Sequence, residues 1–275
     1  MISALSSAAL QIAGFYNQNS IDLSKTLQRL SSGKKFLSPA DDIGDYMKAQ
    51  DLQSQADGYD PVITNISEWQ GAMGVASSAA GEISNSLQRM SELVLLSQQS
   101  TDPDQQDAYQ SEFTQLVNNV DKITNSTYYE GNYLLNNSAG ATQATVYLNP
   151  DTSLNASLAI KLPLSVDTTD LKTVNIGSTA PDFANAAKYV KAATASNNTF
   201  IATAAGYTTT LNSFYNIATT TQTNTLGAVS NVSNIDDAAE LVNYTMQSMH
   251  QQMATAMLAQ ANLLNQGILS LYQNL

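Results

Sequence analysis

Apolar residues recur every three or four positions over most of the chain, which is the spacing of one face of a helix. The longest such run alternates threes and fours and predicts a coiled-coil-like helix: Ile63, Ile66, Gln70, Met73, Ala76, Ala80, Ile83, Leu87, Met90, Val94 and Ser97. An earlier run predicts a first helix, which Gly33 would end: Leu5, Ala9, Ile12, Tyr16, Asn19, Leu23, Leu27 and Leu30. A final run predicts a terminal helix with about 3.67 residues per turn, typical of a straight or slightly right-handed bundle: Val242, Met246, Met249, Met253, Met257, Ala261, Leu264, Ile268, Leu271 and Leu275.

Helix-start signals divide the chain between the first two runs and after them. Ser38 and Pro39 suit the N-cap and the first position of a second helix, in whose first turn Asp41 and Asp42 would complement the dipole. The sequence 101–103, Thr-Asp-Pro, predicts a further helix start. Three helical segments are therefore expected between the first break and residue 127.

Two short hairpins are predicted after these segments. YYEGNYLL (128–135) places a Glu-Gly-Asn turn between aromatic and aliphatic residues, and strands at 145–148 and 157–162 flank a second turn. Residues 163–181 have no clear period and are predicted to be loop with room for one short strand. From Asp182 the chain is rich in Ala and Thr with spaced aromatic residues, and it predicts a long helix.

The composition excludes several classes of site. A net charge of −12 and a pI near 4.2 argue against nucleic acid or an anionic membrane as the partner. The chain has no cysteine, which excludes disulfides and thiolate metal sites, and its one histidine, His250, excludes a multi-histidine metal site. No apolar run is long enough to span a membrane. Because the first basic residue is Lys25, we expect no Sec signal peptide and expect Met1 onward to be mature protein.

Charge is missing from both ends of the chain. No Asp, Glu, Lys or Arg lies in residues 1–21 or after Glu240. An exposed amphipathic helix normally carries charge on its solvated face, so the two terminal helices are predicted to be buried on nearly all sides. One chain cannot bury both of its own ends in this way, whereas stacked copies of the chain can.

Other residues admit a catalytic or ligand-binding interpretation, but each has a simpler structural one. Asp41 and Asp42 are adjacent on a helix and point apart, so complementation of the dipole is favoured over metal binding. The two lysines 34–35 have no glycine-rich phosphate loop beside them. His250 has no carboxylate partner on its helix and is favoured as a polar residue on a polymer-facing helix, and the methionine row is more typical of packing than of a ligand groove. The sequence predicts no enzyme, no cofactor and no metal site, and favours a self-assembling structural subunit.

Four blocks of sequence resemble bacterial flagellins in order and spacing. LQRLSSGKKFLSPADD (27–42) is similar to the N-terminal signature, ISNSLQRMSEL (83–93) to a second block, YYEGNYLL to the aromatic-x-Gly turn, and MLAQANLLNQGILSLYQNL (257–275) to the C-terminus. The chain departs from the family pattern after Gly33, where Lys-Lys-Phe-Leu replaces Leu-Arg-Ile-Asn, and at its terminal Tyr-Gln-Asn-Leu. The hook–filament junction protein shares the N-terminal motif and the coiled coil, and is the nearest alternative.

The resemblance implies a mainly α fold of long antiparallel coiled-coil helices with paired N- and C-terminal helices and a small hairpin region at about 128–165. Residues 1–40 with 235–275 would form the inner-core part and 41–234 the coiled-coil domain, without a sizeable outer domain. It implies a subunit of the extracellular flagellar filament, used for motility and exported through the type III apparatus, with terminal helices that order on polymerisation. The alternatives are a hook-associated junction protein and, with less support, a filament-attached enzyme. The partners implied are further copies of the chain, an export chaperone at the C-terminal helix, hook-associated and cap proteins, and an animal innate immune receptor.

Three sets of residues follow from the pattern and the resemblance together. The polymerisation interface is predicted to comprise Leu5, Ile12, Leu23, Leu27, Val242, Met246, Met249, Met253, Met257, Leu264, Ile268 and Leu271. The inter-domain joint is predicted to comprise Gly33, Pro39, Asp41, Asp42, Asp236 and Asp237. The positions similar to those that the immune receptor contacts are Arg89 and Leu93, flanked by Gln88 and Glu92.

Overall fold

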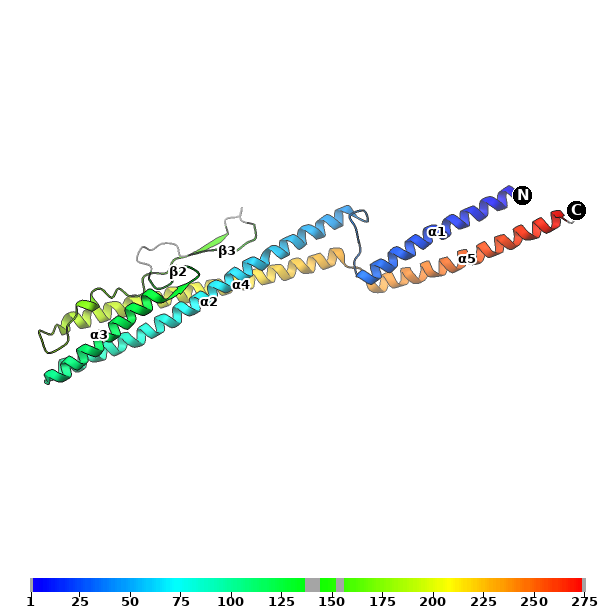
Figure 1. Cartoon of the computed structure of the whole chain (residues 1–275). Coiled ribbons are helices and arrows are strands. Elements are labelled where there is room, and N and C mark those ends of the chain that lie inside the picture. Colours follow the sequence, from blue (N-terminus) through cyan, green and yellow to red (C-terminus); the bar gives the residue numbers. More distant parts are fainter. Residues whose placement is uncertain (1, 137–143, 152–155, 274–275) are drawn as a thin grey trace. The chain divides into compact units, whose positions relative to one another are not determined.

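The structure, a computed structural model, describes residues 2–136, 144–151 and 156–273 (Figure 1). Long helices make up most of this described chain: α1 (Ile2–Ser32), α2 (Ile43–Gln99), α3 (Pro103–Ser126), α4 (Phe183–Ser233) and α5 (Asp237–Gln273). The predicted mainly α fold is confirmed. The chain forms two compact units, Met1–Ser54 with Asn224–Leu275 and Gln55–Thr223. The predicted domain boundaries at residues 40 and 235 lie at the helix breaks and differ from the bounds of these two units. The predicted domains stay a prediction.

The first break lies where the sequence predicts it. Gly33 adopts a left-handed conformation (φ +68°), and its N–H donates to the Arg29 carbonyl at 2.8 Å. Glycine reaches this conformation at little cost, and it is the usual residue just past a helix C-terminus. Gly33 therefore ends α1.

The predicted start of the second helix is wrong. Ser38 is not an N-cap and Pro39 is not the first helical residue, because α2 begins four residues after the proline. The Asp41 carboxylate accepts from the N–H groups of Leu37 and Ser38 at 3.0 and 3.1 Å and holds this stretch in a turn. These bonds lower the pKa of Asp41. Asp42 is the residue that caps α2, since its Oδ1 accepts from the third N–H of the helix at 3.0 Å.

α2 is one helix of 57 residues and passes through Pro61. The expectation of three helical segments before residue 127 is wrong, because only α2 and α3 occupy this stretch. Proline removes one helical hydrogen bond, but Pro61 is exposed while Val62 and Ile66 beside it are buried. Packing of the neighbouring residues offsets the lost bond. The start of α3 is as predicted, with Asp102 as N-cap and proline in the first turn.

The long heptad run forms the core of the unit Gln55–Thr223. Every predicted seam position from Ile66 to Ser97 is buried except the half-buried Gln70, whose side chain donates to Asn212 of α4 at 2.8 Å. α3, α4 and the hairpin region supply the other core residues, among them Phe113, Phe200 and Leu211. The coiled-coil helix predicted from the period is present, and it pairs with α4 in the antiparallel arrangement that the resemblance implies.

A buried asparagine ties three segments of this core together. Asn197 of α4 is fully buried, and its Nδ2 donates to the Ala80 carbonyl at 2.8 Å and to Ser84 Oγ at 2.9 Å, both on α2. The buried Ser165 hydroxyl donates to Asn197 Oδ1 at 2.7 Å. A buried polar group of this kind fixes the register of a coiled coil, since a shifted register leaves its partners unpaired.

Both predicted hairpins are present. β1 (Tyr128–Tyr129) and β2 (Asn132–Tyr133) pair antiparallel across Glu130 and Gly131, which have φ of 47° and 85°. Two positive φ values in a two-residue loop are those of the type I′ turn that hairpins favour. β3 (Ala144–Tyr147) and β4 (Ser157–Ile160) form the second antiparallel pair.

Residues 163–181 form an extended strap over α2 and α3 rather than a free loop. The strap contains one short helix, η2 (Leu171–Thr173), and no strand. Asp121 of α3 holds it through the Thr168 hydroxyl at 2.7 Å and the Lys172 ammonium at 2.9 Å, and these two partners lower the pKa of Asp121. Asp107 likewise accepts from the N–H and hydroxyl of Ser178. The strap closes the core over α2 and α3.

Threonines cover much of α4. Their hydroxyls donate to the carbonyl four residues earlier, for example from Thr203 to Thr199 at 2.8 Å and from Thr223 to Thr219 at 2.8 Å. Such back-bonding satisfies a hydroxyl within the helix. The predicted long helix is therefore confirmed despite its threonine content.

Candidate assembly surface on the terminal helices

α1 and α5 belong to the same unit and run side by side (Figure 1). The least exposed positions of α5 step by threes and fours along one face: Tyr244, Gln247, Gln251, Ala254, Leu258 and Ala261. On α1 the least exposed residues in its C-terminal two thirds include Ile12, Tyr16, Asn19, Leu23, Thr26 and Leu30. The two helices pair through a heptad-like seam of their own.

This intramolecular seam is partly polar. Asn19 is buried, and its Nδ2 donates to the Gln247 carbonyl at 2.8 Å and to Gln251 Oε1 at 3.0 Å. The Thr26 side chain is buried further along α1. Hydrogen bonds from Asn19 to these two residues fix the register of the two helices. The sequence placed Asn19 in the seam, but gave no signal that Gln247 and Gln251 would be its partners.

The methionine row lies on a different face of α5 from this seam. Val242, Met246, Met249, Met253, Met257 and Leu264 are all 43 to 57% exposed. Among the residues that the structure describes, none covers this face, which we call the methionine face of α5. On α1, Ile12 and Leu23 are half-buried and Leu27 is exposed, together with Leu10, Phe15 and Ile21. The side chains of Leu5, Ile268 and Leu271 lie outside the described residues.

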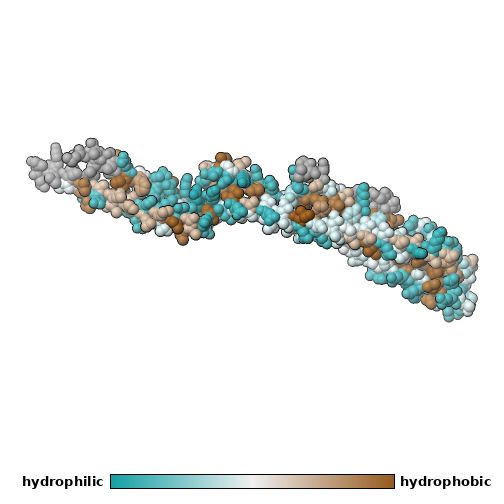
Figure 2. Space-filling view, turned by 180° about the vertical axis from the view of Figure 1, so that it is seen from behind, coloured by the Kyte–Doolittle hydropathy of each residue, from teal (hydrophilic) through white to brown (hydrophobic). Residues whose placement is uncertain are grey.

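Figure 2 shows apolar surface along α1 and α5, beside the grey atoms of their ends. A groove of about 450 Å³ follows the two helices there and is lined by Gln11, Ile12, Phe15, His250, Met253, Ala254 and Met257. The rings of Phe15 and His250 are 6.2 Å apart and tilted by 53°. His250 is exposed at the edge of this groove, and the groove is otherwise apolar except for Gln11. The groove has the character of a packing surface.

The joint that follows α1 is hydrogen-bonded to the segment that precedes α5. Lys34 and Asn234 form an antiparallel bridge, and the Ile235 N–H donates to the Gly33 carbonyl at 3.1 Å. The Lys34 ammonium also donates to Asn234 Oδ1 at 2.9 Å and to Ser233 Oγ at 3.1 Å. The two connectors therefore form a clasp.

The predicted joint residues contribute to this region in different ways. Gly33 belongs to the clasp, and Asp236 caps α5 by accepting from the N–H groups of Ala238 and Ala239 at 3.0 and 3.2 Å. Asp237 is the first residue of α5, and Pro39 lies in the exposed turn before α2. The sequence analysis did not assign a role to Lys34. The available signal was that a lysine stands here where the flagellin pattern has leucine.

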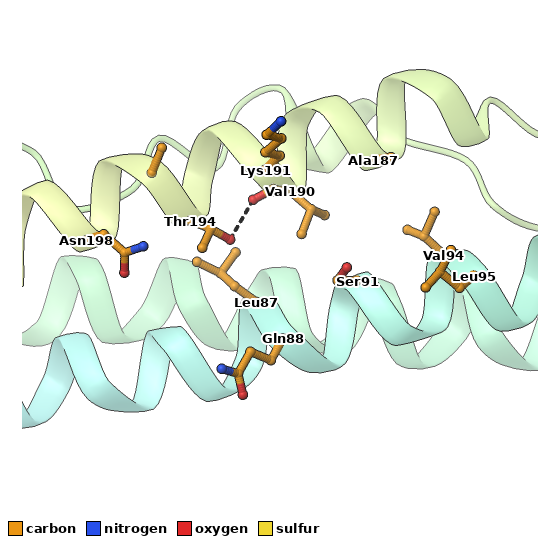
Figure 3. A pocket seen from close by; sticks show the side chains of 11 residues that line it. Leu87, Gln88, Ser91, Val94, Leu95, Ala187, Val190, Lys191, Thr194 and Asn198 are labelled. Carbon is orange, nitrogen blue, oxygen red and sulfur yellow. Dashed lines mark hydrogen bonds between the residues drawn. The ribbon is translucent and has the colours of Figure 1, made fainter.

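A second groove lies between α2 and α4 in the unit Gln55–Thr223 (Figure 3). It has a volume of about 540 Å³, and Leu87, Val94 and Val190 contribute apolar side chains to it. Gln88, Lys191 and Asn198 supply polar groups. Arg89 and Leu93, the positions similar to immune-receptor contacts, do not line this groove, and of the flanking residues only Gln88 does.

The remaining three of those residues are placed very differently. Arg89 pairs with Glu112 of α3 at 2.7 and 3.1 Å and with Glu92 at 3.1 Å. The bidentate pairing raises the pKa of Arg89 and lowers that of Glu112. Leu93 is fully buried in the core, so its side chain is not available at the surface of the folded chain. Gln88, Arg89 and Glu92 are accessible.

The described residues contain no group of three or more His, Asp or Glu side chains that could hold a metal ion. None of the described helices is both long and apolar enough to cross a membrane. Long paired helices with an uncovered apolar face on the terminal pair define a helical structural protein.

Comparison with known proteins identifies the family. The family model of the bacterial flagellin N-terminal helical region matches residues 4–140, and that of the C-terminal helical region matches residues 189–272. A flagellin of Halalkalibacterium halodurans is 27% identical over 256 residues, which cover 90% of each chain. The chain belongs to the bacterial flagellin family, whose members are structural filament subunits.

Other relatives are longer than this chain. Polar flagellin F of Vibrio parahaemolyticus is 34% identical over 119 residues, which are 43% of this chain and 32% of that protein. The match therefore spans about a third of the Vibrio relative. The crystal structure of Bacillus cereus flagellin is 20% identical, with a TM-score of 0.41 over 59% of this chain and 88% of that one. Both family models and both curated relatives are flagellins, and the hook–filament junction alternative has no better support.

Proposed function

We propose that this chain polymerises into the extracellular flagellar filament by covering the methionine face of α5 and the exposed apolar residues of α1 with neighbouring copies. The observation that carries the proposal is the exposure of six large apolar side chains on α5, all 43 to 57% exposed. An apolar stripe of this kind, on a helical segment that has no Asp, Glu, Lys or Arg after Glu240, marks an interaction surface.

Covering this face contributes a favourable free energy to assembly. Covering a half-exposed Val, Leu or Met side chain contributes roughly 1 kcal/mol, so the six side chains contribute roughly 6 kcal/mol for each subunit before the groove and α1 are counted. No Asp, Glu, Lys or Arg lies in residues 1–21 or after Glu240. Assembly therefore buries no formal charge from the described parts of these segments, and the desolvation cost is small.

Membership of the family supports proposals about export and partners. We propose that the chain leaves the cell through the flagellar type III apparatus, that an export chaperone covers α5 before export, and that hook-associated and cap proteins contact the assembled filament. An animal innate immune receptor is a further proposed partner, which would contact Gln88, Arg89 and Glu92. An enzyme attached to the filament has little support, because residues 163–181 form a strap too short to carry a catalytic domain.

The proposal is tested with charge on the methionine face. We expect Met249→Glu and Met253→Glu to abolish filaments, because each buries an unpaired carboxylate in the polymer. Met47→Glu is the matched control, since Met47 is 51% exposed but lies on α2. Negative-stain electron microscopy and sedimentation would be used to score assembly, and circular dichroism would be used to score folding. Ordinary filaments from either α5 variant would contradict the proposal, as would filaments from a chain that lacks residues 241–275.

A further inference from the structure

Half of the methionines in the sequence lie on the methionine face of α5. Met246, Met249, Met253 and Met257 are 43 to 53% exposed and step by three and four, so they form one stripe. Met246 and Met257 are eleven positions apart, which is roughly 16 Å along a helix. Two others, Met73 and Met90, are fully buried in the core of the unit Gln55–Thr223.

Exposure decides which methionines an oxidant can reach. A thioether sulfur reacts with a hydroperoxide when the oxidant can approach it, and a buried one in a packed core is protected. The sulfur lone pair attacks one peroxide oxygen and the O–O bond breaks. After proton transfer the departing oxygen leaves as water from hydrogen peroxide, or as an alcohol from an organic hydroperoxide. The sulfur is oxidised by two electrons to the sulfoxide, and the peroxide is reduced.

We propose that Met246, Met249, Met253 and Met257 form an oxidation site that controls assembly: a hydroperoxide converts them to sulfoxides in the free subunit and thereby blocks its addition to a filament. This inference rests on the proposed function, because the block requires that neighbouring copies cover this face. Sulfoxide reductases restore the thioethers and with them the competence to assemble.

The surroundings of the stripe explain why a sulfoxide would be excluded from the polymer. Met253 and Met257 line the groove with Ile12 and Phe15, and Gln11 and His250 are its only polar or ionisable side chains. A sulfoxide carries a strongly polar S–O bond that must be hydrogen-bonded when it is buried. Within the groove, sulfoxides at Met253 and Met257 would have only these two side chains as hydrogen-bond partners, so covering the oxidised face with apolar surface of neighbouring copies would bury polar oxygens.

The same geometry makes assembled filaments resistant. Once neighbouring copies cover the methionine face, its sulfurs are no closer to solvent than those of Met73 and Met90. Oxidation therefore acts on subunits before they are incorporated, whereas subunits already in the filament are protected.

The experiment compares oxidised and untreated subunits. Purified monomer is treated with hydrogen peroxide, the excess is removed, and sulfoxides are located by mass spectrometry of chymotryptic peptides, since no Lys or Arg follows Lys191 for trypsin to cut. We expect sulfoxide at the four stripe positions, none at Met73 or Met90, and a rise of about tenfold or more in the critical concentration for assembly. Treatment with methionine sulfoxide reductases A and B should reverse the rise, and preformed filaments should resist the same dose.

Two variants assign the effect to the stripe. The quadruple Met→Leu change at 246, 249, 253 and 257 keeps an apolar face that peroxide cannot alter, and it should assemble equally well before and after treatment. Met47→Leu removes an exposed methionine outside the stripe and should stay as sensitive as the wild type. An unchanged critical concentration for oxidised wild type, or equal sensitivity of the quadruple variant, overturns the inference while the proposed function stands. Failure of untreated wild type to assemble overturns both.

Discussion

The buried Asn197 makes the sharpest prediction about stability. Asn197→Ala removes one hydrogen-bond acceptor, Oδ1, and one donor group, Nδ2, from the core of the unit Gln55–Thr223. The Ser165 hydroxyl then stays buried without its partner, at a cost of about 1–3 kcal/mol. The cavity left by the amide adds about 1 kcal/mol. The Ala80 carbonyl contributes little to the loss, because it lies inside a continuous helix. We expect the free energy of unfolding to fall by about 3 kcal/mol.

The single tryptophan supplies the assay. Trp69 is 5% exposed in the core of the same unit, with its ring 6.2 Å from that of Tyr129, so its fluorescence reports the unfolding of this unit. With a urea m-value of about 2 kcal/mol/M, a loss of 3 kcal/mol lowers the unfolding midpoint by about 1.5 M. The double variant Asn197→Ala with Ser165→Ala should recover about 1–2 kcal/mol, because the unpaired hydroxyl is also removed.

Asn198 provides the matched control. It is adjacent on α4 but exposed, so Asn198→Ala should change stability by less than about 0.5 kcal/mol. If the midpoint of Asn197→Ala shifts no further than that of Asn198→Ala, the buried network does not stabilise the fold as argued. If the double variant is less stable than Asn197→Ala alone, the unpaired hydroxyl is not the main cost.

Acid and glycine substitutions test other parts of the same unit. The pKa of Asp121 is lowered in the folded chain. The contribution of its carboxylate to the free energy of unfolding is therefore complete above the unfolded pKa of about 4 and is lost as the pH falls through the lower folded pKa. The difference in urea midpoint between wild type and Asp121→Asn should shrink from pH 7 to pH 3. Gly74→Ala should raise stability by about 0.5–1 kcal/mol, because nothing lies within 4 Å of the added Cβ in a helix interior. Gly58→Ala should lower it, because the new Cβ would lie 2.7 Å from Cβ of Pro150, and thermal unfolding midpoints that rank the two glycine variants the other way would contradict this reading.

Local signals in the sequence were sufficient for most of the fold. The α2 seam is readable because each buried position follows from its neighbours, and Gly33 and the Glu130–Gly131 turn are readable because few residues adopt a positive φ. The start of α2 was misplaced because Ser38–Pro39 and Asp42 carry equivalent capping signals. Only the competing turn made by Asp41 decides between them.

The candidate surface was predictable in composition but not in arrangement. α5 has two stripes whose members step by threes and fours, and the sequence does not say which one faces α1. The choice depends on the hydrogen bonds of Asn19 to Gln247 and Gln251, which are 228 and 232 residues away in the chain. The burial of Leu93 on the core side of α2 was not predictable either, because a resemblance of sequence does not show which residues are solvent-accessible.

The threonine hydroxyls of α4 have a consequence for the environment that the chain tolerates. Residues 192–235 contain no Asp, Glu, Lys or Arg, so the exposed face of this stretch is hydrated through neutral hydroxyl and amide groups. Interactions of neutral groups are not screened by salt, whereas those of exposed charges are. The outward face of α4 should therefore hold the same structure in dilute fresh water and in strong brine.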